Sequence, residues 1–300
     1  MRIMKLFTQG REESSLAFGG QALIEGVMIR SRTHVVLCVR QPNSEILTRI
    51  EKINCLSERY KILGLPFLRG IIALLETFYL GVKGIYFSAN AVLEEEEKFT
   101  YKELAIVFAM SLALASFFFI VPYLLTNLFN FTGVLFNVVE AIIRLTIFLL
   151  YLTLVAMWGE FKRILQYHGA EHKTINAYEA RAALKVANVK KFSRLHPRCG
   201  TSFIFIVLLV SILLFSIMPD LGFFAKLAYR VLLIPVIGAI SYEFLKLSGR
   251  YKDSIVTRIL TMPGLAFQRL TTKEPDDDMI EVVIKAVKEV SALSLKVPKM

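Results

Sequence analysis

Three of the four histidines in this chain fall within one short span, together with one of its three cysteines. Two of them, His168 and His172, are four residues apart, so on a helix their rings project from one face on successive turns. Two imidazoles placed in this way can bind one metal ion. Glu171 lies one turn after His168, where its carboxylate can flank the same site. This H-x-x-E-H spacing is the inverted form of the zincin motif, in which the glutamate is the general base toward a metal-bound water.

A second pair, His196 and Cys199, has the H-x-x-C spacing found among zinc ligands. Together with His168 and His172 it would complete a tetrahedral site with no open position, which would be structural. A catalytic site would use three protein ligands and a water, with one of the four residues released. The sequence leaves both forms open, and we prefer the catalytic one. A thiolate ligand favours Zn²⁺ over Mg²⁺, although iron or cobalt suits the same set.

The composition is that of a membrane protein. Of the 300 residues, 55% are hydrophobic, which is untypical of a soluble domain. The net charge of +11 suits cytoplasmic loops that face anionic lipid. Specific nucleic-acid binding would need aromatic residues among the basic ones or a known module, and the sequence has neither. Cys38, Cys55 and Cys199 are too few and scattered for a disulfide framework, which fits a reducing compartment.

Four stretches have the apolar character of transmembrane helices, namely 104–126, 134–158, 202–218 and 223–247. The connecting loops 127–133 and 219–222 carry no Lys or Arg, whereas the remaining segments carry most of them. Positive charge in short loops marks the cytoplasmic side. This distribution therefore predicts two helical hairpins, with both termini and the middle loop in the cytoplasm.

Outside these spans the sequence predicts a small α+β portion. Two β-prone runs flank a turn at 41–44, which indicates a β-hairpin at 34–52. The pattern of the segment 66–93 predicts a helix with a narrow charged stripe. We expect this helix on the membrane surface or packed against the spans. Acidic residues 276–278 follow a proline and precede apolar residues at helical spacing, which is typical of a helix start, here for a helix at 276–292.

The predicted fold class is therefore mainly α: a polytopic helical membrane protein of about four transmembrane helices with a small α+β cytoplasmic portion. The expected division of the chain is an N-terminal cytoplasmic segment (1–65), an interfacial helix (66–103), a first transmembrane hairpin (104–158), a cytoplasmic loop with the metal site (159–201), a second transmembrane hairpin (202–247) and a cytoplasmic helical tail (248–300).

This topology places the candidate ligands on one side of the membrane. The second span should end near Trp158, and its helix could continue to His168, roughly 15 Å further. The pair at 196–199 directly precedes the third span, so it emerges on the same side. Two further carboxylates, Glu25 and Glu243, could stand behind the ligands. Within the second span, Glu140 and Arg144 are spaced to neutralise one another.

Four segments of the sequence are distinctive: GGQALIEGVMIR at 19–30, YHGAEHKT at 167–174, HPRCGTS at 196–202 and LTTKEPDDD at 270–278. They resemble the signatures of the YqhQ-like bacterial membrane proteins, a domain-of-unknown-function family described as predicted metal-dependent enzymes. The resemblance covers nearly the whole chain. It implies a bacterial inner-membrane location and a metal site at the positions His168, Glu171, His172, His196 and Cys199, and it supplies no settled substrate.

Two functions follow as expectations. The first is a zinc-dependent hydrolase at the cytoplasmic membrane interface, acting on a peptide, a lipid headgroup or another interfacial substrate, with Glu171 activating water. The alternative is a non-enzymatic membrane scaffold or assembly factor whose metal is structural and which binds a protein partner. In both, the bilayer is a partner, and a basic cluster would contact anionic headgroups. That cluster is Lys190, Lys191, Arg194 and Arg198.

Overall fold

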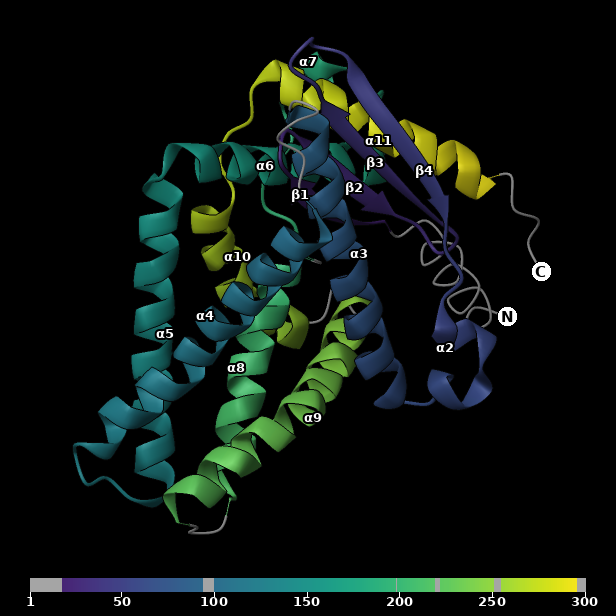
Figure 1. Ribbon diagram of the computed structural model, residues 1–300. Coiled ribbons are helices and arrows are strands. Elements are labelled where there is room, and N and C mark those ends of the chain that lie inside the picture. Colours follow the sequence, from purple (N-terminus) through teal and green to yellow (C-terminus); the bar gives the residue numbers. More distant parts are fainter. Residues whose placement is uncertain (1–17, 94–99, 198, 219–221, 251–254, 296–300) are drawn as a thin grey trace.

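The computed structural model describes residues 18–93, 100–197, 199–218, 222–250 and 255–295. This part of the chain is mainly helical and contains a four-stranded antiparallel sheet. Figure 1 shows the sheet at one end of the molecule, with a group of long helices extending away from it.

The sheet is a meander of two hairpins. Its strands, in the order β1-β2-β3-β4, are β1 (Gly19–Leu23), β2 (Gly26–Arg30), β3 (His34–Arg40) and β4 (Ile46–Lys52). The predicted hairpin at 34–52 is confirmed as β3 and β4. The strands at 19–30 are not predicted from the sequence, because β2 is almost wholly buried and lacks the apolar–polar alternation of a half-exposed strand.

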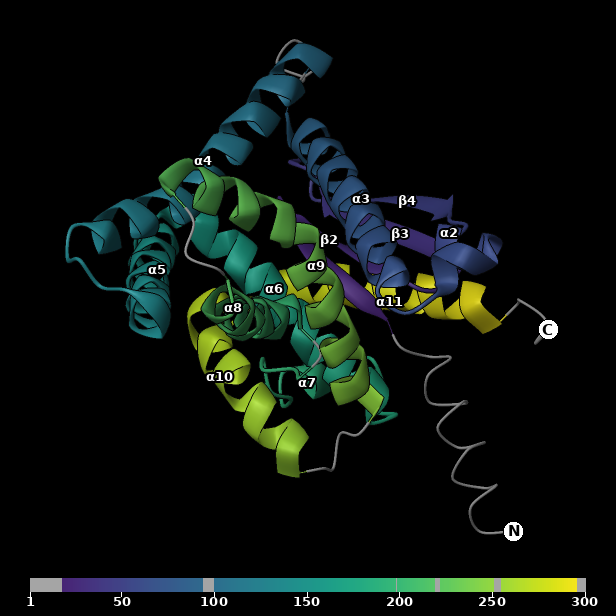
Figure 2. The same ribbon diagram turned by 90° about the horizontal axis from the view of Figure 1, so that it is seen from below.

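Helices cover both faces of the sheet, as Figure 2 shows. On one face, Val27 and Val36 pack against α6 (Gly159–Glu179) and α11 (Asp277–Leu295). On the other face, the alternate residues Met28 and Val35 pack toward Leu80 of α3 (Leu68–Val92). Because α6 carries the two histidines of the candidate site, its packing on the sheet fixes where that site lies.

The remaining helices are α2 (Leu56–Arg59), η1 (Lys61–Gly64), α4 (Tyr101–Asn127), α5 (Gly133–Met157), α7 (Val186–Val189), α8 (Gly200–Ser216), α9 (Phe223–Arg250) and α10 (Ile255–Thr271). Within the described residues, three helices are long and apolar enough to cross a membrane: Leu68–Val92, Gly133–Met157 and Phe223–Leu247. The last two coincide with predicted spans. The other two predicted spans form α4 and α8, whose described apolar segments are shorter, Ser116–Asn127 and Phe203–Ser216.

Helix α3 meets the length and hydropathy of a span although we expected it at the interface or against the spans. Its charged stripe faces partners within the protein, and the pairs are Arg69 with Glu243, Glu76 with Arg30, and Lys83 with Glu51. Leu75, Phe78 and Tyr79 are exposed on other faces of the helix. The helix therefore turns its charges inward, against α9 and the sheet, and leaves apolar side chains outside.

The helix of the second span does not continue to His168. Trp158 has extended backbone angles (φ −76°, ψ 127°), and it separates α5 from α6. In Figure 1, α6 lies across the end of α5. The expectation of one continuous helix is wrong because Tyr167 and Ala170 of α6 belong to the core formed with the sheet and α11, which requires α6 to leave the direction of α5.

The C-terminal part forms two helices. The predicted helix start at the acidic residues is confirmed, since α11 begins at Asp277 with Asp277 and Asp278 in its first turn. The preceding helix, α10, packs against α8 and α5 and ends at Thr271. This end of α10 meets α6, so the tail contributes to the surroundings of the histidines.

Helix α6 approaches the segment after α10 so closely that an added methyl group should disturb the contact. A Cβ added at Gly169 would lie 2.0 Å from the carbonyl oxygen of Lys273. We expect Gly169→Ala to lower the free energy of unfolding by about 1–3 kcal/mol, as overpacking does. Gly159, in the first turn of the same helix, has open space around its added Cβ, so Gly159→Ala is the matched control. Thermal unfolding in detergent that shows equal stability for the two variants would contradict this packing.

Candidate metal centre

Three potential ligands converge between α6 and the start of α8. The rings of His168 and His172 lie side by side on α6, with centroids 4.4 Å apart. Cys199, the N-cap of α8, places its Sγ 3.2 Å from Nε2 of His168. One ligand atom from each of these three residues lies within 4.8 Å of those of the other two. We call this group the His-His-Cys triad.

Backbone carbonyls set the tautomers of the two histidines. Nδ1 of His168 lies 2.7 Å from the carbonyl oxygen of Thr271, and Nδ1 of His172 lies 2.6 Å from that of Arg194. A carbonyl oxygen only accepts, so each Nδ1 must carry the hydrogen. In the neutral ring, Nε2 then has a free lone pair. Burial lowers the pKa of His172, which favours this neutral form. Carbonyl contacts of this kind are typical behind metal-bound histidines.

His196 is buried beside the triad but is held differently. Its backbone N–H donates to Oε1 of Gln268, and its carbonyl accepts from Nε2 of Gln268, both at 2.8 Å. Its ring centroid is 5.8 Å from that of His172, and its Nε2 lies 3.5 Å from the carboxylate of Glu179. Of the four predicted ligands, the described structure therefore brings three together and directs the fourth toward Glu179.

Glu171 is buried between α6 and the sheet. A Cβ added at Gly20 of β1 would lie 2.2 Å from Oε1 of Glu171, so glycine at this position makes room for the carboxylate. Burial raises the pKa of Glu171, and this effect is opposed by the charges of His168 and His196. The carboxylate thus faces Gly20 of the sheet, is shielded from solvent and is influenced electrostatically by His168 and His196.

The two carboxylates that we expected behind the ligands make other contacts. Glu25, at the β1–β2 turn, pairs with Arg163 of α6 at 2.5 Å and lies 3.5 Å from the hydroxyl of Tyr167. Glu243 of α9 pairs with Arg69 of α3. The structure thus places Glu25 in an ion pair with α6 and Glu243 in an ion pair with α3. Neither carboxylate stands behind the triad.

The basic cluster takes part in the same local framework. Lys190 pairs with Asp277 at 2.7 Å, and Nη1 of Arg194 donates to the carbonyl oxygen of Thr272. Arg198 lies outside the described residues. Two members of the cluster thus bind the start of α11 and the segment that precedes it.

Sequence reasoning missed the residues that orient the site. Thr271, Gln268 and Glu179 have no metal-ligand spacing, and Thr271 and Arg194 act through backbone carbonyls that any residue would supply. The family resemblance is the signal that could have pointed to Thr271, because its segment at 270–278 contains this residue; in the same way its segment at 19–30 contains Gly20, which makes room for Glu171.

Comparisons with known proteins identify the family of the chain. Residues 65–293 match the family DUF1385, described as "Protein of unknown function". The chain is 36% identical over 304 aligned positions to "Uncharacterized protein YqhQ" of Bacillus subtilis (strain 168), and the alignment covers 92% of this chain and 93% of that protein. No solved structure matches the chain significantly.

Proposed function

The chain belongs to the DUF1385 family of YqhQ-like proteins, and we propose that it is a multi-pass protein of the bacterial inner membrane with a zinc-dependent hydrolase site at the cytoplasmic interface. The observation that supports this proposal most strongly is the His-His-Cys triad, in which carbonyls behind both imidazoles direct their Nε2 lone pairs toward one thiol.

The number of converging ligands favours catalysis over a purely structural metal. Structural zinc sites have four protein ligands, whereas catalytic sites have three and keep one position for water or substrate. The triad supplies three. A closed site would need His196, and the ring of this residue is directed toward Glu179.

The residues of the chain have separate roles in this proposal. A bound zinc ion would supply Lewis acidity and lower the pKa of a water molecule in the open position. His168, His172 and Cys199 would hold the ion, and the carbonyls of Thr271 and Arg194 would keep the rings oriented. Glu171 would accept the proton of the attacking water as general base. Its burial against Gly20 would keep bulk water away from the carboxylate.

The membrane placement follows from charge and from the apolar surface. We place α4, α5, α8 and α9 across the bilayer and the sheet with α6 and α11 on the cytoplasmic side, because the connecting segments on that side carry most Lys and Arg. Helix α3 would lie at the boundary, since Leu80 packs toward the sheet and Gly70 packs against Ala239 of α9. Exposed Ile62 and Phe67 before α3 would enter the lipid. The site would then meet substrates at the membrane surface.

Glu171→Gln tests the hydrolase proposal. We expect this variant to keep its zinc and its fold, because the triad is intact, and to lose about 10²–10⁴-fold in rate, which is the usual contribution of a general base. The probes are a fluorogenic acyl ester, a fluorogenic phosphodiester and a quenched peptide, each tested on zinc-loaded protein in detergent. A wild-type protein that binds zinc and cleaves none of them would favour the structural alternative. Full activity in Glu171→Gln would remove Glu171 from the mechanism.

A further inference from the structure

The chain between β4 and α3, residues 53–67, exposes a group of large apolar side chains. It contains the two short helices α2 and η1, and in Figure 1 it lies below the sheet, beside the first part of α3. We call it the 53–67 segment. An exposed group of apolar side chains larger than single scattered residues marks an interaction surface. Its exposed apolar residues are Leu56, Tyr60, Ile62, Leu65 and Phe67.

Phe67 is exposed in spite of a strained backbone. Its φ of 68° and ψ of −52° are rare for a residue that has a side chain. The backbone N–H of Leu68 donates to the carbonyl oxygen of Pro66 at 2.9 Å, which closes a γ-turn of the strained form around Phe67. Strain of this kind persists where function requires it, and the ring is 54% exposed. A surface that covers this ring would give the conformation a purpose.

Both ends of the 53–67 segment are fixed to long helices. At the first end, the backbone N–H of Leu56 donates to Oε1 of Glu76 of α3 at 2.7 Å. Just beyond the second end, Nε of Arg69 donates to Oε1 of Glu243 of α9 at 2.7 Å. Glu243 lies about 6 Å of helix before the end of the candidate span Phe223–Leu247. The segment therefore meets α9 at the level where this span ends.

The exposed apolar surface continues from the segment onto the neighbouring helices. Leu68 and Leu75 of α3 are exposed, as are Phe244 and Leu247 of α9. Helix α3 packs against both η1 and α9. Because α3 and α9 are each long and apolar enough to cross a membrane, the expected cover of their exposed faces is lipid. This continuity favours a bilayer over a protein partner as the cover of the 53–67 segment.

The charges in this part of the chain favour an anionic surface. Between β4 and α3 the sequence has the basic residues Lys52, Arg59 and Lys61 and one acidic residue, Glu58. The three basic residues are exposed, and the guanidinium carbon of Arg59 lies 5.4 Å from the ring centroid of Tyr60. Tyrosine is enriched at the membrane–water interface, and basic residues are attracted to the anionic lipids of the cytoplasmic leaflet.

We propose that the 53–67 segment is an anchor on an anionic phospholipid surface, with Ile62 and Phe67 entering the acyl region and Arg59 and Lys61 at the level of the phosphates. An amphipathic segment of this kind lies in the interface, with its apolar face about 5–10 Å deep. The inference rests on the membrane placement proposed above, but it does not depend on zinc or on hydrolysis. Because the segment directly follows β4, it would also hold the sheet at a fixed distance from the bilayer.

The first test measures the depth of the segment by fluorescence quenching of full-length protein in nanodiscs. Ile62→Trp is made in a Trp158→Phe background, since Trp158 is the single native tryptophan. Brominated phosphatidylcholine quenches an indole only at short range, so we expect it to lower the emission of Ile62→Trp at least about twofold at the proposed depth. Leu47→Trp is the matched control, because Leu47 is also exposed but lies at the start of β4, away from the segment. Its emission should stay unchanged.

Native Trp158, at the end of α5, separates this proposal from the membrane placement. If bromolipid quenches Trp158 in the wild-type protein but leaves the emission of Ile62→Trp unchanged, the anchor is overturned and the spanning helices stand. If neither indole is quenched, the anchor and the membrane placement both fail. Neither measurement needs bound zinc or activity, so the fate of the hydrolase proposal is decided separately.

The second test asks whether the segment prefers anionic lipid. Mixed nanodiscs of one composition carry bromine either on phosphatidylglycerol or on phosphatidylcholine, and the quenching of Ile62→Trp is compared. We expect phosphatidylglycerol to be enriched about fivefold around the indole, the effect of one basic residue near an anionic surface. Arg59→Gln/Lys61→Gln should remove this preference, and Lys288→Gln, which changes an exposed lysine of α11, should keep it. Equal quenching by both lipids, or equal effects of these two variants, would overturn the proposal.

Discussion

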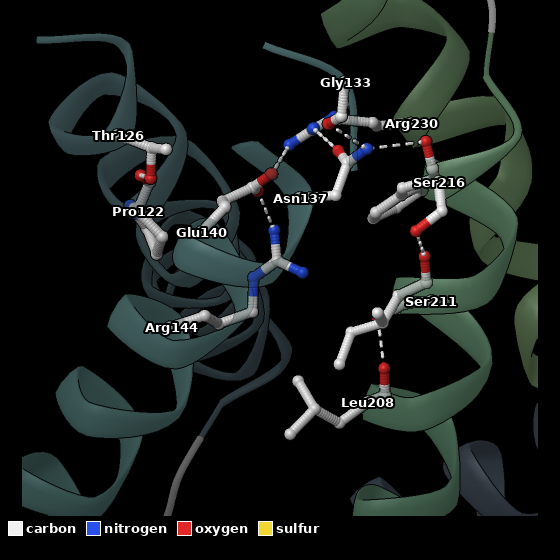
Figure 3. A network of polar contacts seen from close by, with 12 residues as sticks. Pro122, Thr126, Gly133, Asn137, Glu140, Arg144, Leu208, Ser211, Ser216 and Arg230 are labelled. Atoms are coloured by element: carbon white, nitrogen blue, oxygen red, sulfur yellow. Dashed lines mark hydrogen bonds and ion pairs between the residues drawn. The ribbon is translucent and has the colours of Figure 1, made fainter. Parts of the chain in front are cut away.

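Glu140→Gln is expected to destabilise the protein by about 3–5 kcal/mol, the usual cost of removing one partner from a buried ion pair. The carboxylate of Glu140 is 2% exposed and neutralises Arg144 of its own helix and Arg230 of α9 (Figure 3). A neutral amide would leave both guanidinium groups buried without that charge. The measurement is equilibrium unfolding in mixed micelles, followed by circular dichroism.

Two controls show whether the loss comes from this network. Glu160→Gln changes an exposed glutamate in the first turn of α6 and should alter stability by less than about 0.5 kcal/mol. The double variant Glu140→Gln/Arg144→Gln should be less destabilised than the sum of the two single variants, because the second change removes a cation that the first leaves uncompensated. Additive effects would mean that Glu140 and Arg144 do not interact, contrary to the structure.

Loss of a triad ligand should have the largest effect on metal binding. We expect His168→Ala and Cys199→Ser to weaken zinc binding by more than about a hundredfold, since changes even in the groups behind metal ligands cost 10–100-fold. His196→Ala should weaken it by less than about tenfold, because the ring of His196 is directed toward Glu179 and acts at most from behind the ligands. Competition with a chromophoric chelator measures all three affinities.

These three variants distinguish an open site from a closed one. If His196→Ala loses zinc as completely as His168→Ala, His196 is a fourth ligand and the site is structural. Circular dichroism of each variant without metal is the control for folding, and it is needed most for His196 because this residue is buried.

Part of the candidate site could be predicted because it depends on side-chain type and spacing. The four-residue spacing of His168 and His172 predicts adjacent rings on a helix, and their rings are adjacent in the structure. The prediction that Cys199 joins them agrees with the described geometry. That these residues bind a metal stays a prediction. The contacts of Thr271 and Arg194 could not be predicted in the same way, because backbone carbonyls leave no trace in residue type.

The fold was predictable where the signal for an element lies in its own residues. The β3–β4 hairpin and the start of α11 carry local turn and capping signals. The β1–β2 hairpin lacks alternation because helices cover both faces of the sheet. The turn at Trp158 was missed for a related reason: the helix leaves the direction of α5 only because α6 has the sheet to pack on, and that partner is distant in the sequence.

The four segments that resemble the family meet around α6. Gly20 makes room for Glu171, Cys199 contacts His168, and Thr271 accepts from the same ring. The segments come from the N-terminal sheet, from α6, from the start of α8 and from the end of α10. Their convergence is the reason that we base the proposed function on this site.

The most direct test of the proposed function is the metal content and the X-ray absorption spectrum of the purified wild-type protein. We predict one zinc ion per chain, coordinated by two imidazole nitrogens, one sulfur at about 2.3 Å and one further light atom. Purified protein without stoichiometric metal, or a spectrum without a sulfur ligand, would contradict the triad. A spectrum with three imidazoles and one sulfur would instead contradict the open position on which the hydrolase proposal rests.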